Sequence, residues 1–245
     1  MRENIDSVDE LSRMLIKTGC LRFGTFKLSS GGLSSYYVDL RTIPSDPEAF
    51  RKVIGYYSEV LQGDLLARSH SLAGIPTAGI AYGAVLAFNH RKPFLYVRRE
   101  AKEHGTGRRI ERFSGVSVLV LDDVVTTGRN LISAIDTIRA DGGVVEDAVV
   151  LLDRDQGGLA NLEKIGVKLH SFATISQVCR ILLDKGVIDE ADYNQITDQI
   201  GDQSSKSRNS QRSSEQLASS GIRIYSTILH LLTQVIEPLS GSRFL

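Results

Sequence analysis

The chain has 245 residues, of which 42% are hydrophobic and 24% charged, and its 29 Lys and Arg residues balance its 29 Asp and Glu residues. This length is sufficient for one large domain with a sizeable buried core, and the zero net charge excludes a global positive field for nucleic acid or anionic membranes. Any anionic ligand must therefore meet a local cluster of positive groups.

The sequence predicts a reduced, non-membrane environment. No stretch approaches the roughly 18 apolar residues that cross a bilayer, and the charged, amphipathic first segment lacks the apolar region of a secretory signal. Cys20 and Cys179 lie far apart and have no metal-binding spacing, which is typical of reduced structural thiols. We expect a soluble, cytoplasmic protein.

The first 61 residues predict two helices separated by a strand pair. Apolar residues recur at helical spacing over residues 7 to 18, with Asp6 or Ser7 as the N-cap and Gly19 as the end. Residues 24 to 41 are rich in Gly, Ser and Tyr and predict two strands around a polar turn at 29 to 32. Two prolines, Pro44 and Pro47, then mark the start of a helix whose apolar spacing runs from residue 50 to 61.

From about residue 68 the pattern alternates between short apolar strands, glycine-rich turns and amphipathic helices. This alternation predicts an α/β fold with a central, mostly parallel sheet and helices on both faces. Ligands of such sheets bind outside the carboxyl ends of the strands. The predicted strand ends carry polar or glycine-rich sequence: Gly74–Gly79, Arg98 onward, Asp122–Gly128 and Asp153–Arg154.

The last part of the chain has a different composition. Residues 204–220 are Ser-rich and almost free of apolar side chains, which indicates a flexible linker. Residues 221–245 form a tail with the apolar spacing of one short helix. We therefore expect the main domain to occupy residues 1–203.

The most informative stretch is VSVLVLDDVVTTGRN, residues 116–130. An apolar run predicts a central strand that ends in Asp122 and Asp123, where adjacent carboxylates accept hydrogen bonds from a ribose diol. Thr126, Thr127 and Gly128 follow at a helix N-terminus, where free backbone N–H groups favour a phosphate. The alternative is that the Asp and Thr side chains only cap the helix.

This stretch resembles the PRPP-binding motif of the type I phosphoribosyltransferases, enzymes that use 5-phosphoribosyl 1-pyrophosphate (PRPP). The resemblance implies that the Asp pair holds the ribose hydroxyls and that the Thr loop holds the 5′-phosphate. It assigns PRPP binding to Asp122, Asp123, Val124, Val125, Thr126, Thr127, Gly128, Arg129 and Asn130. Arg129 and Asn130 depart from the family, which commonly has small or hydroxyl residues after the glycine.

Residues 97–107, VRREAKEHGTG, resemble the mobile catalytic loop of the orotate phosphoribosyltransferases. The resemblance assigns PRPP contacts to Arg98, Arg99, Lys102 and His104, and catalysis to Lys102 and His104 together with the Asp pair. Cations that close around the departing pyrophosphate stabilise its growing charge. A solvated charged loop is the alternative for such a charge run.

Residues 23–41 resemble the N-terminal hood of the same enzymes, with Ser-Gly followed by a Tyr pair and Asp. Many bacterial relatives have a lysine where this chain has Ser29, and Lys27 lies two residues earlier. The resemblance makes Lys27 and Thr126 candidates for orotate binding.

The segment LLDRDQGG, residues 151–158, places Arg154 at the position of the family arginine that pairs with the orotate carboxylate. A planar guanidinium suits this bidentate contact better than an ammonium group. Residues 72–83 resemble the pyrophosphate-binding turn.

The resemblance covers roughly residues 5–200 and implies a type I phosphoribosyltransferase fold with a small hood, formed by about residues 1–40 and part of the C-terminal region. It implies an enzyme of pyrimidine biosynthesis that converts orotate and PRPP to orotidine 5′-monophosphate and pyrophosphate. Mg²⁺ would be held mainly by PRPP and water rather than by protein ligands, and a homodimer would share the loop across its interface. The alternatives are a purine-specific phosphoribosyltransferase and a non-catalytic PRPP-sensing regulator, although no DNA- or RNA-binding element is apparent.

Overall fold

The computed structural model describes residues 2–27, 33–98 and 116–202, all of which fall in one compact unit. The first elements are α1 (Arg2–Lys17), the hairpin strands β1 (Leu21–Lys27) and β2 (Leu33–Val38), the 3-10 turn η1 (Ile43–Ser45), α2 (Pro47–Val60) and α3 (Asp64–Arg68). Alternating strands and helices follow: β3 (Ser71–Gly74), α4 (Ala78–Asn89), β4 (Phe94–Tyr96), β5 (Val118–Val125), α5 (Arg129–Ala140), β6 (Asp147–Asp153), α6 (Gly158–Lys164), β7 (Lys168–Thr174) and α7 (Ile175–Asp184). A further helix covers residues 190–202.

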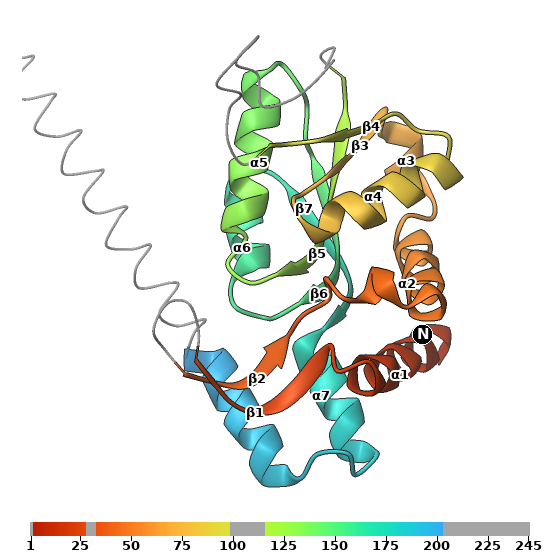
Figure 1. The fold of residues 1–245 in the computed structure, drawn as a ribbon. Coiled ribbons are helices and arrows are strands. Elements are labelled where there is room, and N and C mark those ends of the chain that lie inside the picture. Colours follow the sequence, from red (N-terminus) through yellow and green to blue (C-terminus); the bar gives the residue numbers. More distant parts are fainter. Residues whose placement is uncertain (1, 28–32, 99–115, 203–245) are drawn as a thin grey trace, which may run out of the picture. The chain divides into compact units, whose positions relative to one another are not determined.

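The central sheet is parallel throughout its described strands, which lie in the order β4-β3-β5-β6-β7. β5 and β6 are almost entirely buried, and apart from two Asp residues in each strand they are apolar, as expected for strands that are covered on both faces. Helices α2 and α4 pack on one face of this sheet, and α5 and α6 pack on the other (Figure 1). The predicted parallel sheet with helices on both faces is therefore confirmed.

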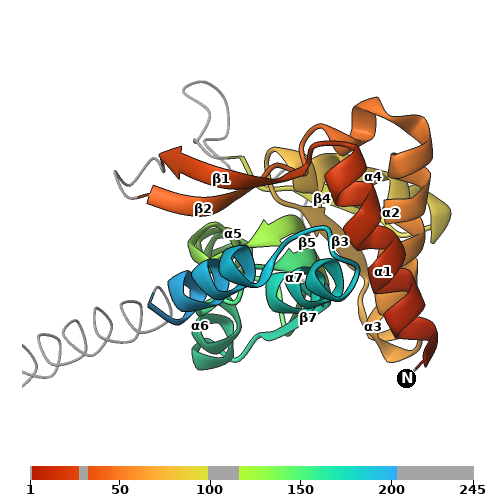
Figure 2. The same cartoon turned by 90° about the horizontal axis from the view of Figure 1, so that it is seen from below.

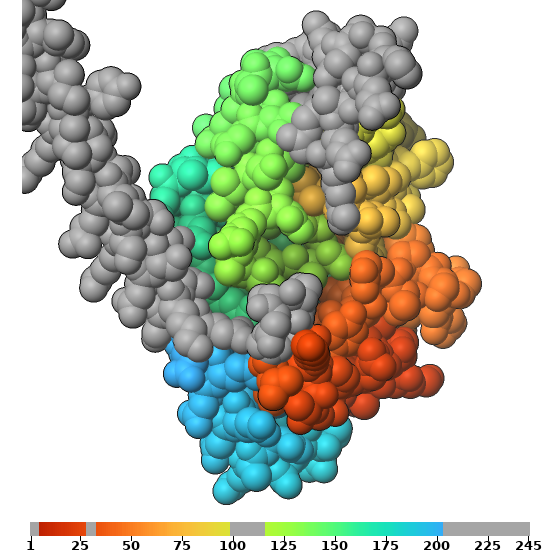
Figure 3. Space-filling model, turned by 60° about the vertical axis from the view of Figure 1, so that its left-hand side comes forward, coloured from red at the N-terminus to blue at the C-terminus, as the bar shows by residue number. Residues whose placement is uncertain are grey.

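The N-terminal hairpin lies beyond the carboxyl ends of the central strands (Figure 1). β1 and β2 pair antiparallel, with Phe23 opposite Tyr36 and Lys27 opposite Leu33. Seen from below, the hairpin runs beside α1 and the helix of residues 190–202 (Figure 2). The space-filling view likewise shows the first and last described segments in contact (Figure 3). This hairpin matches the predicted strand pair, and its expected turn at 29–32 lies outside the described residues.

Hydrogen bonds fasten the helix of residues 190–202 to the hairpin. The side-chain oxygen of Gln199 accepts from the backbone N–H and the hydroxyl of Ser35, both at 2.8 Å, and its Nε2 donates to Ser34 at 2.9 Å. Segments more than 160 positions apart in the chain therefore form one layer over the ends of the strands.

One local prediction needs revision. The predicted cap at Asp6 or Ser7 is wrong, because α1 begins at Arg2 and both residues lie inside it. The helix ends as predicted before Gly19, which has a φ of 70°. The elements between β6 and residue 203 were not predicted individually.

Among the described residues, no helix is long and apolar enough to span a membrane.

Candidate active site

The order of the strands defines where the sheet opens toward a ligand. After β3, the chain passes through α4 on one face of the sheet and reaches β4 at the edge. β5 lies on the other side of β3, and the chain continues from β5 into α5 on the opposite face. The loops after β3 and β5 therefore diverge at a topological switch point, the place where open α/β sheets bind ligands.

Asp122 and Asp123 lie in the second half of β5 beside this point, with only 6% and 8% of their surfaces exposed. The carboxylate of Asp122 accepts the backbone N–H of Asp123 at 3.0 Å, and its carbonyl accepts the hydroxyl of the fully buried Tyr57 at 2.6 Å. Burial raises the pKa of Asp123, and the positive charge of Arg41 acts in the opposite direction. These hydrogen bonds hold the pair in a place where the ionised form of Asp123 is costly. Carboxylates with a perturbed pKa are common at functional sites.

The loop from Thr126 to Gly128 connects β5 to the N-terminus of α5. Gly128 adopts a left-handed conformation with φ 79°, which glycine enters without a steric penalty. Asn161 donates to the carbonyl of Thr127 at 2.9 Å and fixes the loop from α6. The predicted PRPP-binding residues of this loop line a pocket of about 210 Å³: Asp122, Val124, Val125, Thr126, Thr127, Gly128, Arg129 and Asn130. Asp123 is absent from that lining.

The turn after β3 approaches β5 closely because glycines line the contact. A Cβ on Gly79 would lie 2.5 Å from the carbonyl oxygen of Leu121, and one on Gly74 would lie 2.5 Å from the carbonyl oxygen of Gly79. The peptide bond between Pro76 and Thr77 is cis. Small residues therefore let the first turn of α4 sit directly beside Asp122.

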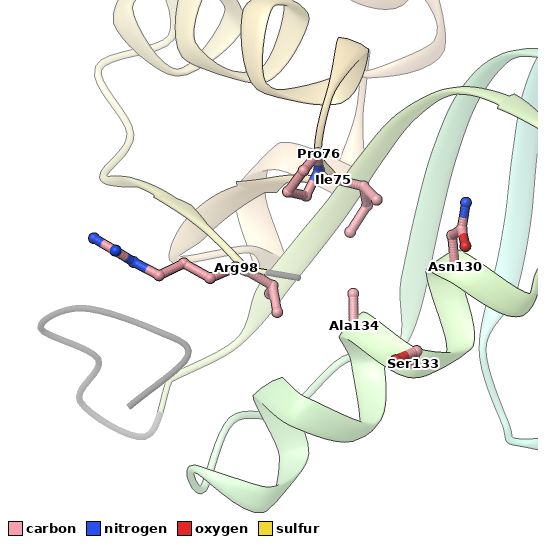
Figure 4. Close-up of a pocket in the computed structure, with 7 residues that line it drawn as sticks. Ile75, Pro76, Arg98, Asn130, Ser133 and Ala134 are labelled. Atoms are coloured by element: carbon pink, nitrogen blue, oxygen red, sulfur yellow. The ribbon is translucent and has the colours of Figure 1, made fainter. Parts of the chain in front are cut away.

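A second pocket, of about 340 Å³, adjoins this turn (Figure 4). Ile75 and Pro76 form one wall, and Asn130, Ser133 and Ala134 of α5 form the facing wall. Arg98 also lines the pocket, but its side chain extends away from α5 (Figure 4) and its guanidinium lies 5.9 Å from the centre of the Tyr96 ring. The other predicted cations of this loop, Arg99, Lys102 and His104, lie outside the described residues.

Arg154 follows β6 and lies beside the loop that carries Thr126. Its backbone N–H donates to the carbonyl of Val125 at 3.0 Å, which joins the ends of β5 and β6. Its guanidinium carbon lies 4.7 Å from the centre of the Tyr36 ring, and its Nε donates to the Tyr36 hydroxyl at 3.3 Å. The structure therefore brings Arg154 and the Asp122–Gly128 stretch to one edge of the sheet.

Lys27 does not share this position. It is exposed at the far end of β1, opposite Leu33, while the hairpin residue that contacts Arg154 is Tyr36, opposite Phe23. Four residues of extended chain separate Lys27 from Phe23, about 13 Å. Its contact with orotate stays a prediction.

Sequence reasoning missed the contacts that hold Arg154. The Tyr pair of the hairpin was recognised, but nothing in the sequence relates Tyr36 to a residue 118 positions later. Gln156 was also missed, and its Nε2 donates to the same Tyr36 hydroxyl at 3.2 Å. Such contacts arise only when the hairpin folds over the strand ends.

Within the described ranges, no three His, Cys, Asp or Glu side chains come together as a metal site. The Asp122–Asp123 pair offers the carboxylate oxygens that Mg²⁺ prefers, but too few of them for a complete protein cage. These residues fit an ion that arrives with most of its ligands supplied by a substrate and by water.

The curated orotate phosphoribosyltransferase of Cenarchaeum symbiosum is 43% identical over 184 residues, which cover 74% of this chain and 92% of that protein. The chain belongs to the orotate phosphoribosyltransferase family. Among solved structures, the orotate phosphoribosyltransferase of Aeropyrum pernix matches with a TM-score of 0.65 and 38% identity over 73% of this chain and 99% of its own. A Leishmania donovani UMP synthase matches with a TM-score of 0.70 and 31% identity over 79% of this chain, which spans 42% of that protein's length. No family model matches the sequence.

Membership of the orotate phosphoribosyltransferase family confirms the predicted family, the type I fold and a phosphoribosyltransferase activity in pyrimidine biosynthesis. The residue roles inferred from the motifs remain predictions.

Proposed function

We propose that this chain transfers the phosphoribosyl group of Mg²⁺-bound PRPP to orotate, giving orotidine 5′-monophosphate and pyrophosphate for UMP synthesis. The observation that carries this proposal is the adjacency of two chemically different sites. β5 carries the buried Asp pair and continues into a loop at a helix N-terminus, where a phosphate can bind. Arg154 directly follows β6, and its backbone N–H donates to the carbonyl of Val125. PRPP and an aromatic carboxylate would both find partners along this one edge.

The Asp122 and Asp123 carboxylates would accept hydrogen bonds from the two ribose hydroxyls. The backbone N–H groups after Thr126, at the positive end of α5, would bind the 5′-phosphate. The strand that carries the Asp pair leads directly into this loop. The ribose hydroxyls and the 5′-phosphate would therefore be bound by one continuous segment of the chain. This holds the anomeric carbon at a defined place for attack.

Arg154 would bind the orotate carboxylate with both terminal amino groups of its guanidinium. That contact, with Thr126 nearby, turns the pyrimidine N1 toward the anomeric carbon. The bond from N1 to this carbon would form as the bond to pyrophosphate breaks. Both bonding electrons leave with the pyrophosphate, and the proton of N1 is released to solvent. Lys27 remains a weaker candidate for orotate binding, since the hairpin register places it away from Arg154.

When bound, Mg²⁺ neutralises pyrophosphate oxygens, and we assign its ligands mainly to PRPP and water. We further assign the closing cations to Arg98, Arg99, Lys102 and His104, of which Lys102 and His104 act as catalytic residues. We also propose a cytoplasmic homodimer in which this loop reaches the active site of the partner subunit. Residues 204–245 take no part in the reaction.

The proposal is tested by measuring consumption of orotate with PRPP and Mg²⁺, with adenine, hypoxanthine and uracil as alternative acceptors. Orotate should be consumed with stoichiometric release of pyrophosphate, and the other bases should react at least about 100-fold more slowly, as expected for a buried charged contact that they lack. Preference for a purine would assign the chain to a different base. Binding of PRPP without turnover of any base would indicate a regulator.

A further inference from the structure

Tyr36 is buried completely at the junction of the hairpin and the sheet, yet its polar atom faces the candidate active site. Its ring lies under the Arg154 guanidinium at 4.7 Å, and its hydroxyl accepts both the Nε of Arg154 at 3.3 Å and the Nε2 of Gln156 at 3.2 Å. A ring face and a hydroxyl of one residue thus fix both the plane and the rotation of the guanidinium.

These contacts determine which edge of the Arg154 guanidinium faces a bound carboxylate. Among the described residues, the guanidinium is held through its face and its Nε. A carboxylate would therefore be bound end-on, by the two terminal amino groups. The geometry of a bidentate pair depends on this orientation, because two parallel N–H···O bonds form only when the fork faces the carboxylate.

Tyr36 is itself held firmly. Its carbonyl accepts the Ser34 hydroxyl at 2.7 Å, and Ser34 in turn accepts Nε2 of Gln199 at 2.9 Å. Burial raises the pKa of Tyr36, so the phenol stays neutral, and its oxygen accepts both hydrogen bonds. The orientation of Arg154 is thus set by the hairpin and by the helix of residues 190–202, neither of which carries a residue of the predicted PRPP motif.

We propose that Tyr36 is a positioning residue for Arg154, and that it sets the affinity for orotate without touching the substrate. The inference rests on the proposed function, since it takes Arg154 as the group that binds the orotate carboxylate. A tyrosine that served only as core packing would influence stability and leave the substrates' Michaelis constants alone.

The test is Tyr36→Phe, which keeps the ring and removes the hydroxyl. Loss of this hydrogen bond should raise the KM for orotate by about 3- to 10-fold, with kcat and the KM for PRPP within about twofold of wild type. The matched control is Tyr56→Phe, because Tyr56 is also buried and donates its hydroxyl to Glu10 at 3.0 Å, outside the candidate site. It should lower Tm by a similar amount and leave both Michaelis constants unchanged.

A double-mutant cycle with Arg154→Ala separates positioning from general disturbance. In the Arg154→Ala background, Tyr36→Phe should have no further effect on the KM for orotate. A similar effect in both backgrounds, or no effect in the wild-type background, would overturn the inference and leave the proposed function standing. An unchanged KM for orotate in Arg154→Ala alone would overturn both.

Gln156→Met removes the second donor to the same hydroxyl and provides an independent variant if Tyr36→Phe yields little folded protein. It should raise the KM for orotate by a smaller factor than Tyr36→Phe, again without affecting that for PRPP. Equal changes in the two Michaelis constants would contradict the inference.

Discussion

The carboxyl groups of Asp122 and Asp123 sit at a strand end where burial disfavours their charge. Burial raises the pKa of Asp123 despite the nearby Arg41, so the charged form of this residue carries an electrostatic cost that a purely structural turn would avoid. Replacing both residues by Asn should weaken PRPP binding by about tenfold or more, since charge-assisted hydrogen bonds to the ribose hydroxyls are lost. Calorimetric titration with PRPP measures this directly.

A matched control for the Asp pair lies at the other end of the sheet. Asp147 is 5% exposed and pairs with Arg68 at 2.8 Å and His170 at 2.7 Å. Asp147→Asn should lower Tm and leave PRPP affinity as in wild type. If the double Asn variant bound PRPP within about twofold of wild type and kept its activity, the pair would be reduced to a capping role.

Asp153, the residue before Arg154, predicts a pH dependence of stability. Burial raises its pKa from 3.8 to about 6, because the backbone N–H of Asp155 compensates only partly for the lost water. The folded chain therefore binds more protons than the unfolded chain between about pH 4 and 6, and stability falls as the pH rises through that window. Asp153→Asn should remove this loss.

The free energy of unfolding of Asp153→Asn minus that of wild type should thus be larger at pH 8 than at pH 3.5 by about 1–3 kcal/mol, so the variant is relatively more stable at pH 8. Urea denaturation of both proteins at both pH values measures this change. Any effect of the Asn side chain that does not depend on pH cancels when the two pH values are compared. Asp198→Asn, at an exposed position, controls for the loss of one negative charge. A relative stability that did not vary with pH would show that Asp153 ionises alike in both states.

At the residue scale, local motifs were sufficient to predict that Asp122, Asp123, Thr126–Gly128 and Arg154 lie along one edge of the sheet, because each lies at or near the end of an apolar strand with its own sequence pattern. Tyr36 and Gln156 could not be found in this way. Their proposed role rests on a contact between the hairpin and the end of β6, and no spacing along the chain encodes that contact.

At the scale of elements, the approach of α4 to β5 depends on glycine. Gly79 lies in the first turn of α4, where an added Cβ would meet the backbone oxygen of Leu121 at 2.5 Å and Oδ1 of Asp122 at 3.2 Å. Gly79→Ala should therefore push the helix away from the strand, lower stability by about 1–3 kcal/mol and reduce PRPP affinity by displacing Asp122. Urea denaturation and PRPP titration report the two effects.

Gly55→Ala is the control for this substitution. Gly55 lies in α2, where a Cβ would have no atom within 4 Å, so alanine should stabilise the helix by about 0.5–1 kcal/mol. A Gly79→Ala variant that gained stability in the same way would contradict the close packing of α4 on β5.

The elements of the sheet were predictable up to β6 because each strand and helix carries its own periodicity. The N-terminal cap was placed wrongly, since Ser7 and Asp6 are good capping residues that here lie within a longer helix. The role of the helix of residues 190–202 was not predictable, because its stability and its place come from bonds such as those of Gln199 with Ser34 and Ser35.

At the scale of the whole molecule, all the described residues of the candidate site lie within one compact unit that ends at Ser204. A chain ending at residue 203 should therefore fold and turn over orotate with kcat and KM within about twofold of the full chain. The measurement compares both chains by thermal denaturation and steady-state kinetics. Aggregation or loss of activity in the shortened chain would show that residues after 203 contribute to the folded catalytic unit.

The most direct test of the account is the effect of Arg154→Ala on the two substrates. Losing one partner of a desolvated charge pair costs about 2–5 kcal/mol, so the KM for orotate should rise roughly 30-fold or more, while the KM for PRPP stays within about twofold. Arg154→Lys should recover only part of the loss, because an ammonium group cannot form the bidentate pair. Orotate kinetics that remained intact, or equal damage to the two Michaelis constants, would contradict the assignment of Arg154 to the orotate carboxylate.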